Sequence, residues 1–210
     1  LAPIVCTAKI IMRRVVESNC HWDAQLVTEI EAEFRRWLRD LKCLESFRIP
    51  RFIGTMDFGE IIRRELHTFA DGAHPAYGSC GYIRLVGSDG RVHCSLVMAK
   101  TRICPKKGKL TIPPIELSSA VLASRMVTLL QKELEEKFDA IWIWTDSMSN
   151  LAYIQNEKSR FNIFIGNRLE EIRAMTSVSW WRFVPGADNV ADVLTRPFNT
   201  PKDFGPWHVF

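Results

Sequence analysis

Hydrophobic residues near the N-terminus recur at every third or fourth position, which is the spacing of an amphipathic helix. Charged residues fill the positions between them, and the apolar series consists of Leu26, Ile30, Phe34, Trp37, Leu38 and Leu41. The pattern predicts one helix over residues 23–44. Acidic side chains lie early in this segment and basic ones late, which suits the helix dipole. We expect a scaffold helix that packs through its apolar face.

From residue 66 the pattern changes to short apolar runs that are typical of strands. Strands are predicted over residues 66–71, 81–86, 92–99, 140–144 and 178–184. The sequence Ser88-Asp89-Gly90 predicts a hairpin turn between the second and third of these strands. Antiparallel strands at the start, followed by strands that alternate with helices, indicate an α/β fold with a mixed sheet.

The helices of this second region follow from the same periodicity. They are predicted over residues 116–137, over a segment that ends near residue 156, over residues 161–175, and over a short segment from residue 190. Either Asp188 or Asn189 is expected to cap the last helix. No internal repeat is present, so the region reads as one fold unit.

Four carboxylates stand at the ends of these predicted elements: Asp71, Glu116, Asp146 and Asp192. Each has an ordinary alternative role, as a turn residue, a helix cap or a first-turn acid that interacts with the helix dipole. Buried acids are costly unless a cation meets them, and none of the four has an Arg or Lys in its immediate motif. Together they favour a site for a divalent, oxygen-preferring cation such as Mg²⁺.

Five short motifs narrow this interpretation to a known family. They are Phe69-Ala70-Asp71-Gly72-Ala73, Ala99-Lys100-Thr101-Arg102, Ile112-Pro113-Pro114-Ile115-Glu116-Leu117, Trp144-Thr145-Asp146-Ser147, and Val184-Pro185-Gly186 followed by Ala191-Asp192. In this order they resemble the ribonuclease H region of a Pao/BEL-type LTR retrotransposon polyprotein. The preceding residues 1–51 are similar to the connector that follows reverse transcriptase in such polyproteins.

The resemblance implies a ribonuclease H-like, mixed five-stranded sheet flanked by helices and preceded by a small helical connector. We expect the connector in residues 1–64, the ribonuclease H-like domain in residues 65–197 and a C-terminal tail in residues 198–210. A chain of 210 residues has room for one domain of about 130–150 residues and an appendage. The N-terminal Leu1 suggests a piece of a longer polypeptide.

The same resemblance implies a reaction and a cofactor. Asp71, Glu116, Asp146 and Asp192 are expected to be the catalytic acids and to bind two Mg²⁺ ions, with Mn²⁺ able to substitute. The expected activity is endonucleolytic cleavage of the RNA strand of RNA/DNA hybrids during reverse transcription. One position departs from the family, because Phe183 stands where many relatives carry a histidine that assists product release. We expect slower turnover from that change.

The charge pattern supports a polyanionic partner. The net charge is +4, and no acid occurs between Asp89 and Glu116. A solvated basic loop is the alternative reading of that stretch. We expect two groups of residues to contact the hybrid: Lys100, Arg102, Lys106 and Lys107 through phosphates, and Gly72, Ser118, Ser147 and Asn150 beside the acids.

The remaining expectations concern partners and alternatives. The reverse transcriptase domain of the same polyprotein is the expected protein partner, and no apolar run reaches the roughly 18 residues of a membrane span. Six scattered cysteines suggest reduced thiols and a cytoplasmic setting, within a virus-like particle. Two other functions remain open. The first is a non-catalytic, connection-like module that braces reverse transcriptase and binds template–primer, and the second is a resolvase- or integrase-type nuclease.

Overall fold

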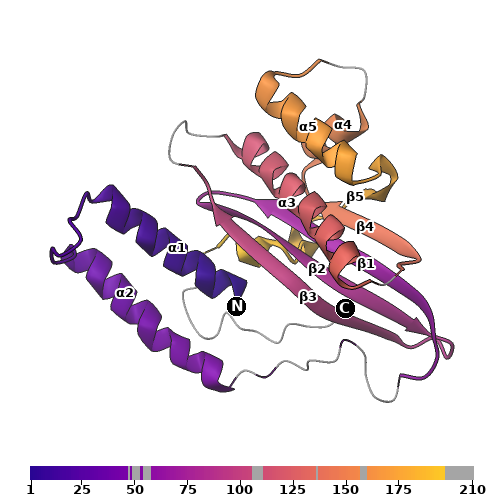
Figure 1. Cartoon of the computed structure of the whole chain (residues 1–210), viewed down its shortest axis with the longest axis horizontal. Coiled ribbons are helices and arrows are strands. Elements are labelled where there is room, and N and C mark those ends of the chain that lie inside the picture. Colours follow the sequence, from indigo (N-terminus) through magenta and orange to yellow (C-terminus); the bar gives the residue numbers. More distant parts are fainter. Residues whose placement is uncertain are drawn as a thin grey trace.

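A mixed sheet forms the centre of the chain (Figure 1). The computed structural model describes residues 1–46, 48, 53, 58–105, 111–135, 137–156 and 160–196. Within these residues the sheet has five strands in the order β3-β2-β1-β4-β5. The strands are β1 Ile61–Gly72, β2 Ala76–Gly87, β3 Val92–Ile103, β4 Ala140–Thr145 and β5 Trp181–Phe183. The β1–β2 and β2–β3 pairs are antiparallel, and β4 runs parallel to both β1 and β5. The predicted five-stranded α/β architecture is confirmed.

The first three strands are longer than their apolar runs predicted, because backbone pairing continues through polar residues. The predicted turn between β2 and β3 is present: Gly87 N–H donates to the Arg91 carbonyl, and Gly90 has φ of +81°. A residue without a side chain adopts that angle at little cost. The hairpin therefore fixes the register that carries Lys100 and Arg102 to the far end of β3.

Three helices, α3 Ile112–Glu133, α4 Met148–Gln155 and α5 Ile163–Met175, follow the first three strands along the chain. A Cβ added to Gly81 would meet Leu130 of α3, whereas one added to Gly78 would meet Leu194. Successive residues of a strand point to opposite faces, so α3 and the segment around Leu194 cover opposite faces of the sheet.

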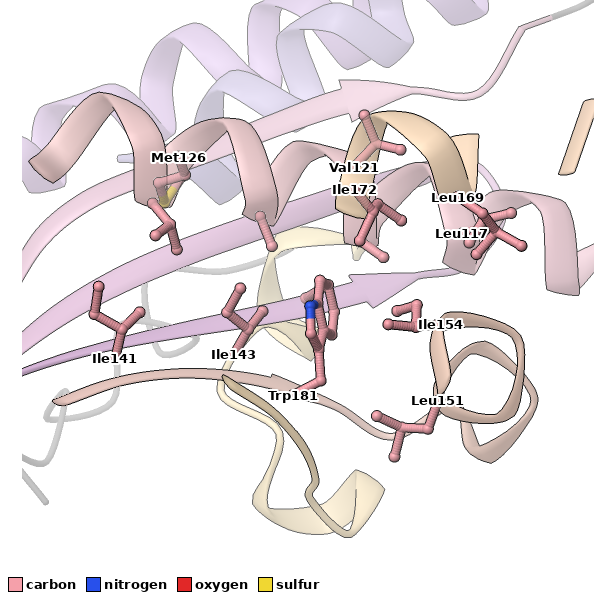
Figure 2. Packing of buried hydrophobic residues seen from close by; sticks show 14 of the residues in the cluster. Leu117, Val121, Met126, Ile141, Ile143, Leu151, Ile154, Leu169, Ile172 and Trp181 are labelled. Atoms are coloured by element: carbon pink, nitrogen blue, oxygen red, sulfur yellow. The ribbon is translucent and has the colours of Figure 1, made fainter. Parts of the chain in front are cut away.

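The main hydrophobic core lies between the sheet and these three helices (Figure 2). Ile143 on β4 and Trp181 on β5 are almost fully buried, and Leu117 of α3 and Ile172 of α5 pack in the same cluster. The buried indole N–H of Trp181 donates to Thr176 Oγ1 at 3.1 Å, so its polar atom is satisfied. This core holds the ends of β1 and β4 in a fixed relation.

The N-terminal region differs from its prediction. Helix α1, Ala2–Glu17, had no counterpart in the predicted elements, and the single helix expected over residues 23–44 is the shorter α2, Thr28–Asp40, followed by a 3-10 turn, Leu41–Ser46. Ile30 is buried, whereas Phe34 and Leu38, two other members of the predicted apolar face, are exposed, so the expected packing through that face is incomplete among the described residues. Helix α1 contacts both α2 and β3, and Lys9 Nζ donates to the Thr101 carbonyl of β3.

Two further elements also depart from the expected pattern. Strand β5 is preceded by a 3-10 turn, Val178–Trp180, where a strand was predicted. The short final helix is, within the described residues, a 3-10 turn at Asp192–Leu194. Among the described helices none is both long and apolar enough to cross a membrane. Cys6, Cys80, Cys94 and Cys104 are buried free thiols, whereas Cys20 and Cys43 are partly exposed.

Candidate metal centre and nucleic-acid interface

Asp71 is the penultimate residue of β1, and Asp146 directly follows the adjacent parallel strand β4. The last register pair between β1 and β4 is Ala70 with Thr145, so the next residues, Asp71 and Asp146, lie at the same edge of the sheet. The resemblance to the ribonuclease H fold implies the same side-by-side placement of these two acids. A pair of carboxylates at neighbouring strand ends is a suitable start for a cation site.

Glu116 reaches this edge from the second turn of α3, not from its first residue as predicted. Pro113 and Pro114 occupy the first turn, where the missing N–H groups are not needed, so the helix begins at Ile112. A Cβ on Gly72 would lie 2.8 Å from the Glu116 Cα. Only glycine allows β1 to approach the helix so closely at this point, which gives Gly72 a packing role beside the acids.

Asp192 comes to the same edge from the 3-10 turn that closes the described chain. Asn189, whose side chain is buried, holds the approach to this turn: its amide donates to the Ala70 carbonyl at 3.0 Å, and its oxygen accepts from Ala191 N–H. Sequence reasoning had treated Asn189 only as a possible helix cap. Asp188 lies exposed in the preceding turn.

Three of the four carboxylates accept hydrogen bonds from protein donors. Thr195 Oγ1 donates to Asp71 Oδ2 at 2.9 Å, and Ser147 Oγ donates to Glu116 Oε2 at 2.8 Å. Arg196 pairs with Asp192 at 2.7 Å across the surface of the turn. The sequence had suggested that none of the acids had a basic neighbour, and Arg196 corrects this for Asp192. Thr195 and Arg196 lay outside the predicted site, although they follow Asp192 by three and four residues.

Mutual repulsion and burial alter the acid strength of two of these groups. Burial raises the pKa of Asp71, and the charges of Asp146 and Asp192 raise it further, against the opposing hydrogen bond from Thr195. Burial likewise raises the pKa of Glu116, with a further contribution from Asp146 and an opposing one from Ser147. Asp146 therefore lies close enough to influence both neighbours. This is the electrostatic signature of clustered carboxylates.

The donor set fits a hard divalent cation in kind, because all four side chains offer carboxylate oxygens. In the side-chain arrangement of the described residues, no three His, Cys, Asp or Glu groups converge into a metal-binding cluster. The hydroxyls of Thr195 and Ser147 and the guanidinium of Arg196 engage oxygens that a cation would use. Asp71, Glu116, Asp146 and Asp192 are the candidate residues for holding a cation at this edge.

The predicted nucleic-acid contacts fall into two groups. Lys100 and Arg102 are exposed on β3, and the register Gly72–Tyr77–Arg102 aligns Arg102 with the acid end of β1. Gly72 and Arg102 are separated by two strand spacings, which is roughly 10 Å. The predicted contacts Lys106 and Lys107 lie outside the described residues.

The polar residues predicted to contact the hybrid are mostly engaged elsewhere. Ser147 is buried and caps α4, with its hydroxyl on Glu116. Ser118 is half-buried and donates to the Pro114 carbonyl. Asn150 is fully buried, and neither amide atom of its side chain has a hydrogen-bond partner among the described residues. Asn150 therefore offers no surface for a nucleic acid in this conformation, because its turn of α4 faces inward.

An arginine-lined cavity lies beside the acid edge, between β2, β3, α3 and α5. Its volume is about 270 Å³, and its polar lining consists of Tyr77, Arg102, Ser118, Arg125, Asn167, Arg168 and Glu171. Arg125 is paired with Glu171, and burial lowers the pKa of the Arg168 guanidinium. Three arginines against one carboxylate leave this cavity cationic, which suits a phosphate. Sequence reasoning identified only Arg102 of the three.

Comparison with known proteins gives a family and a fold likeness. A family model described as "Pao retrotransposon-like RNaseH-like domain" matches residues 1–147, a span that includes Asp71, Glu116 and Asp146 but not Asp192. A search of curated proteins gives no match. Among solved structures, RNase H1 from the halophilic archaeon Halobacterium salinarum is 20% identical with a TM-score of 0.41, over 62% of this chain and 93% of that one.

Two other structures are similar at lower identity. LC11-RNase H1 in complex with RNA/DNA hybrid is 12% identical with a TM-score of 0.41, over 63% of this chain and 93% of that one. The protease-reverse transcriptase of prototype foamy virus is 10% identical with a TM-score of 0.39, over 70% of this chain and 22% of that longer one.

Proposed function

The chain belongs to the Pao retrotransposon-like RNaseH-like domain family, and on that premise we propose that it is a metal-dependent endoribonuclease acting on the RNA strand of RNA/DNA hybrids. One observation supports the proposal: Asp71 and Asp146 lie at the same end of two adjacent parallel strands, and Glu116 and Asp192 lie near enough to interact with them. Reverse transcription is the process in which such hybrids arise, and the reverse transcriptase of the same polyprotein is the proposed partner.

The chemistry of the proposed reaction divides between cofactor and protein. Two Mg²⁺ ions, or Mn²⁺ in their place, supply activation of a water and stabilisation of the leaving 3′-oxygen when bound. Asp71 and Asp146 would hold the cations, with Glu116 and Asp192 as the remaining oxygen donors. Binding would offset the burial and the repulsion that together raise the pKa of Asp71 and Glu116. The expected products carry a 5′-phosphate and a 3′-hydroxyl.

The basic residues of the helix side would bind the hybrid backbone. Lys100 and Arg102 lie in line with the acid end of the sheet, and the arginine-lined cavity continues from Arg102 to Arg125 and Arg168. Contacts of this type fix the position of a duplex without reading its sequence. We therefore expect binding that weakens steeply with salt.

A labelled RNA/DNA hybrid tests the proposal. With Mg²⁺ or Mn²⁺ the protein should cut the RNA strand and leave duplex DNA intact, and chelation should stop the reaction. Asp146→Asn should reduce the rate by at least about 100-fold. Asp192→Asn should also reduce it, whereas Asp188→Asn, an exposed neighbour in the preceding turn, should not. Equal effects of the Asp188 and Asp192 substitutions would contradict the assigned role of Asp192.

A second function is favoured by a specific observation. The Arg196–Asp192 pair and the absence of a convergent acid cluster within the described residues suit a non-catalytic module that braces reverse transcriptase and binds template–primer. In that case the protein binds the hybrid but does not cut it with either metal. Filter binding beside the cleavage assay separates the two functions.

A further inference from the structure

Thr195 directly follows the 3-10 turn Asp192–Leu194, and its side chain reaches the acid edge. Its side chain is almost completely buried, and its Oγ1 lies 2.9 Å from Asp71 Oδ2. The two residues are 124 positions apart in the chain, so this bond joins the end of β1 to the turn that carries Asp192. The proposed reaction assigns no role to this hydroxyl.

The single proton of this hydroxyl has two possible acceptors. Thr195 Oγ1 also lies 2.9 Å from the Asp192 carbonyl oxygen. That carbonyl already accepts the backbone N–H of Thr195 at 3.2 Å. The Asp71 carboxylate is the stronger acceptor of the two. A buried carboxylate without a hydrogen bond costs more free energy than a carbonyl oxygen that accepts one bond instead of two. The proton therefore belongs on Asp71, which leaves Oδ1 as the oxygen not used by Thr195.

The turn that presents Thr195 is itself held in place from the sheet. Thr101 Oγ1 of β3 donates to the Leu194 carbonyl at 2.9 Å, and the Thr101 carbonyl accepts from Lys9 of α1. A Cβ on Gly78 would lie 2.5 Å from Leu194 Cβ, so the turn is pressed against β2. The Thr195 hydroxyl is thus fixed by its surroundings and does not depend on Asp71 for its position.

We propose that Thr195 is a positioning residue of the metal centre, whose hydroxyl orients the Asp71 carboxylate for cation binding and ties it to Asp192. The inference rests on the proposed nuclease function, because it takes the acid edge as the metal site. Hydrogen bonds to a ligating carboxylate set its orientation, and their loss typically lowers metal affinity or activity by about 10–100-fold. Thr195 lies outside the residues that the family model matches.

Two threonines of similar burial give a matched test. Thr195→Val removes the hydroxyl from Asp71 and nearly keeps the shape, whereas Thr195→Ser restores it. Thr101→Val removes a hydroxyl bond to the same turn without touching any of the four acids. Binding of Mn²⁺ in the absence of hybrid is monitored by the loss of the EPR signal of the free ion. Cleavage of the hybrid is measured separately, under single-turnover and steady-state conditions. Thr195→Ala serves as a second removal if the valine variant does not fold.

The expected result is about 10-fold or weaker Mn²⁺ affinity for Thr195→Val, with kcat reduced and KM for the hybrid unchanged. Thr195→Ser should stay near the wild type. Thr101→Val loosens the turn that presents Thr195 but keeps the hydroxyl that bonds to Asp71, so its loss should be clearly smaller than that of Thr195→Val. Unchanged affinity for Thr195→Val, or an equal loss for both valine variants, would overturn the inference while leaving the proposed function intact. If the wild type binds Mn²⁺ and only Thr195→Val loses it, but nothing cuts the hybrid, the inference stands and the proposed function fails. If the wild type neither binds Mn²⁺ nor cuts, both fail.

Discussion

Strand β1 carries two buried acids, Glu65 and Asp71, whose surroundings are opposite. By strand alternation both point to the face away from α3. Glu65 accepts from Arg63 Nε at 2.8 Å and from Arg84 Nη1 at 2.7 Å, and the His67 ring lies 3.2 Å away. Burial alone would raise the pKa of Glu65, but the bonds from His67 and Arg84 and the charges of the two arginines lower it overall.

Asp71, six residues further along, has carboxylates for neighbours and only a hydroxyl as its side-chain partner. Burial and the charges of Asp146 and Asp192 raise its pKa. Glu65 and Asp71 show how a structural buried acid differs from one with a proposed function. Where the fold supplies its own cations, as at Glu65, the acid stabilises the protein. Where the fold gathers further acids instead, as at Asp71, we propose that an external cation supplies the opposite charge.

Removal of the charge at Glu65 is the largest expected effect on stability. Glu65→Gln keeps the shape but leaves Arg63 and Arg84 without their carboxylate. Because their side chains are 51% and 34% exposed, both can turn partly to water, which limits the cost to about 1–3 kcal/mol of unfolding free energy. Urea unfolding measures it. A wild-type midpoint for this variant would mean that the comparison of the two acids is wrong.

Replacement of the Asp71 carboxylate by an amide should stabilise the protein instead of destabilising it. Asp71→Asn removes one charge from a repelling group, so the metal-free protein should gain about 1 kcal/mol. For a chain of this length that raises Tm by roughly 2–4 °C. Calorimetry in the presence of a chelator measures the change, with Asp188→Asn as the exposed control. A loss of stability at Asp71 would show that its hydrogen bond outweighs the repulsion.

The pH dependence of stability should sharpen the contrast further. The pKa of Asp71 is raised in the folded protein, so folding carries a penalty at neutral pH that disappears as pH falls towards the ordinary value of 3.8. The pKa of Glu65 is lowered, so its stabilisation is complete above the ordinary value of 4.5 and is lost as pH falls below it.

In metal-free protein, the stability difference between wild type and Asp71→Asn should therefore shrink as mild acid is reached. The difference between wild type and Glu65→Gln should persist there and shrink only at lower pH. Unfolding measured from about pH 7 to about pH 3 compares the two curves. Parallel curves for both variants would refute the assigned directions.

The smallest expected effect concerns the support of the Glu65 cluster. Trp144 Nε1 donates to His67 Nδ1 at 3.1 Å, which leaves Nε2 to carry the proton towards Glu65. Trp144→Phe should cost about 0.5–1 kcal/mol. In a double-mutant cycle with Glu65→Gln the two losses should be less than additive. Full additivity would separate Trp144 from the Glu65 cluster.

Much of this arrangement could be predicted from local sequence, and the exceptions have physical causes. The apolar runs placed Asp71 and Asp146 at strand ends, and the resemblance to the ribonuclease H fold implied that these two strands are neighbours. Helix α1 was missed because its stabilising contacts, such as Lys9 with β3, are made across the fold. The contacts of Thr195 and Arg196 with the acids do not follow from a regular helix that begins at residue 190, which the sequence predicts. The observed 3-10 turn places Thr195 against Asp71 and Arg196 against Asp192.

The buried Asn150 shows the opposite kind of error. Its position four residues after Asp146 suggested a surface contact with the hybrid, but the first turn of α4 directs its side chain into the protein. The ion pairs of Glu65 could not be predicted from local sequence either. Arg63 lies two residues away on the same strand, but Arg84 comes from β2. Which side chains share a sheet face depends on register, and register is set by the fold as a whole.

Cleavage of an RNA/DNA hybrid by wild type, Asp71→Asn and Glu65→Gln in Mg²⁺ tests the central claim most directly. The two variants each neutralise one buried acid on the same strand and the same face. The account predicts metal-dependent cutting of the RNA strand by the wild type and by folded Glu65→Gln, and a loss of at least about 100-fold in Asp71→Asn. Equal rates for the two variants, or no cutting by the wild type with Mg²⁺ or Mn²⁺, would contradict it.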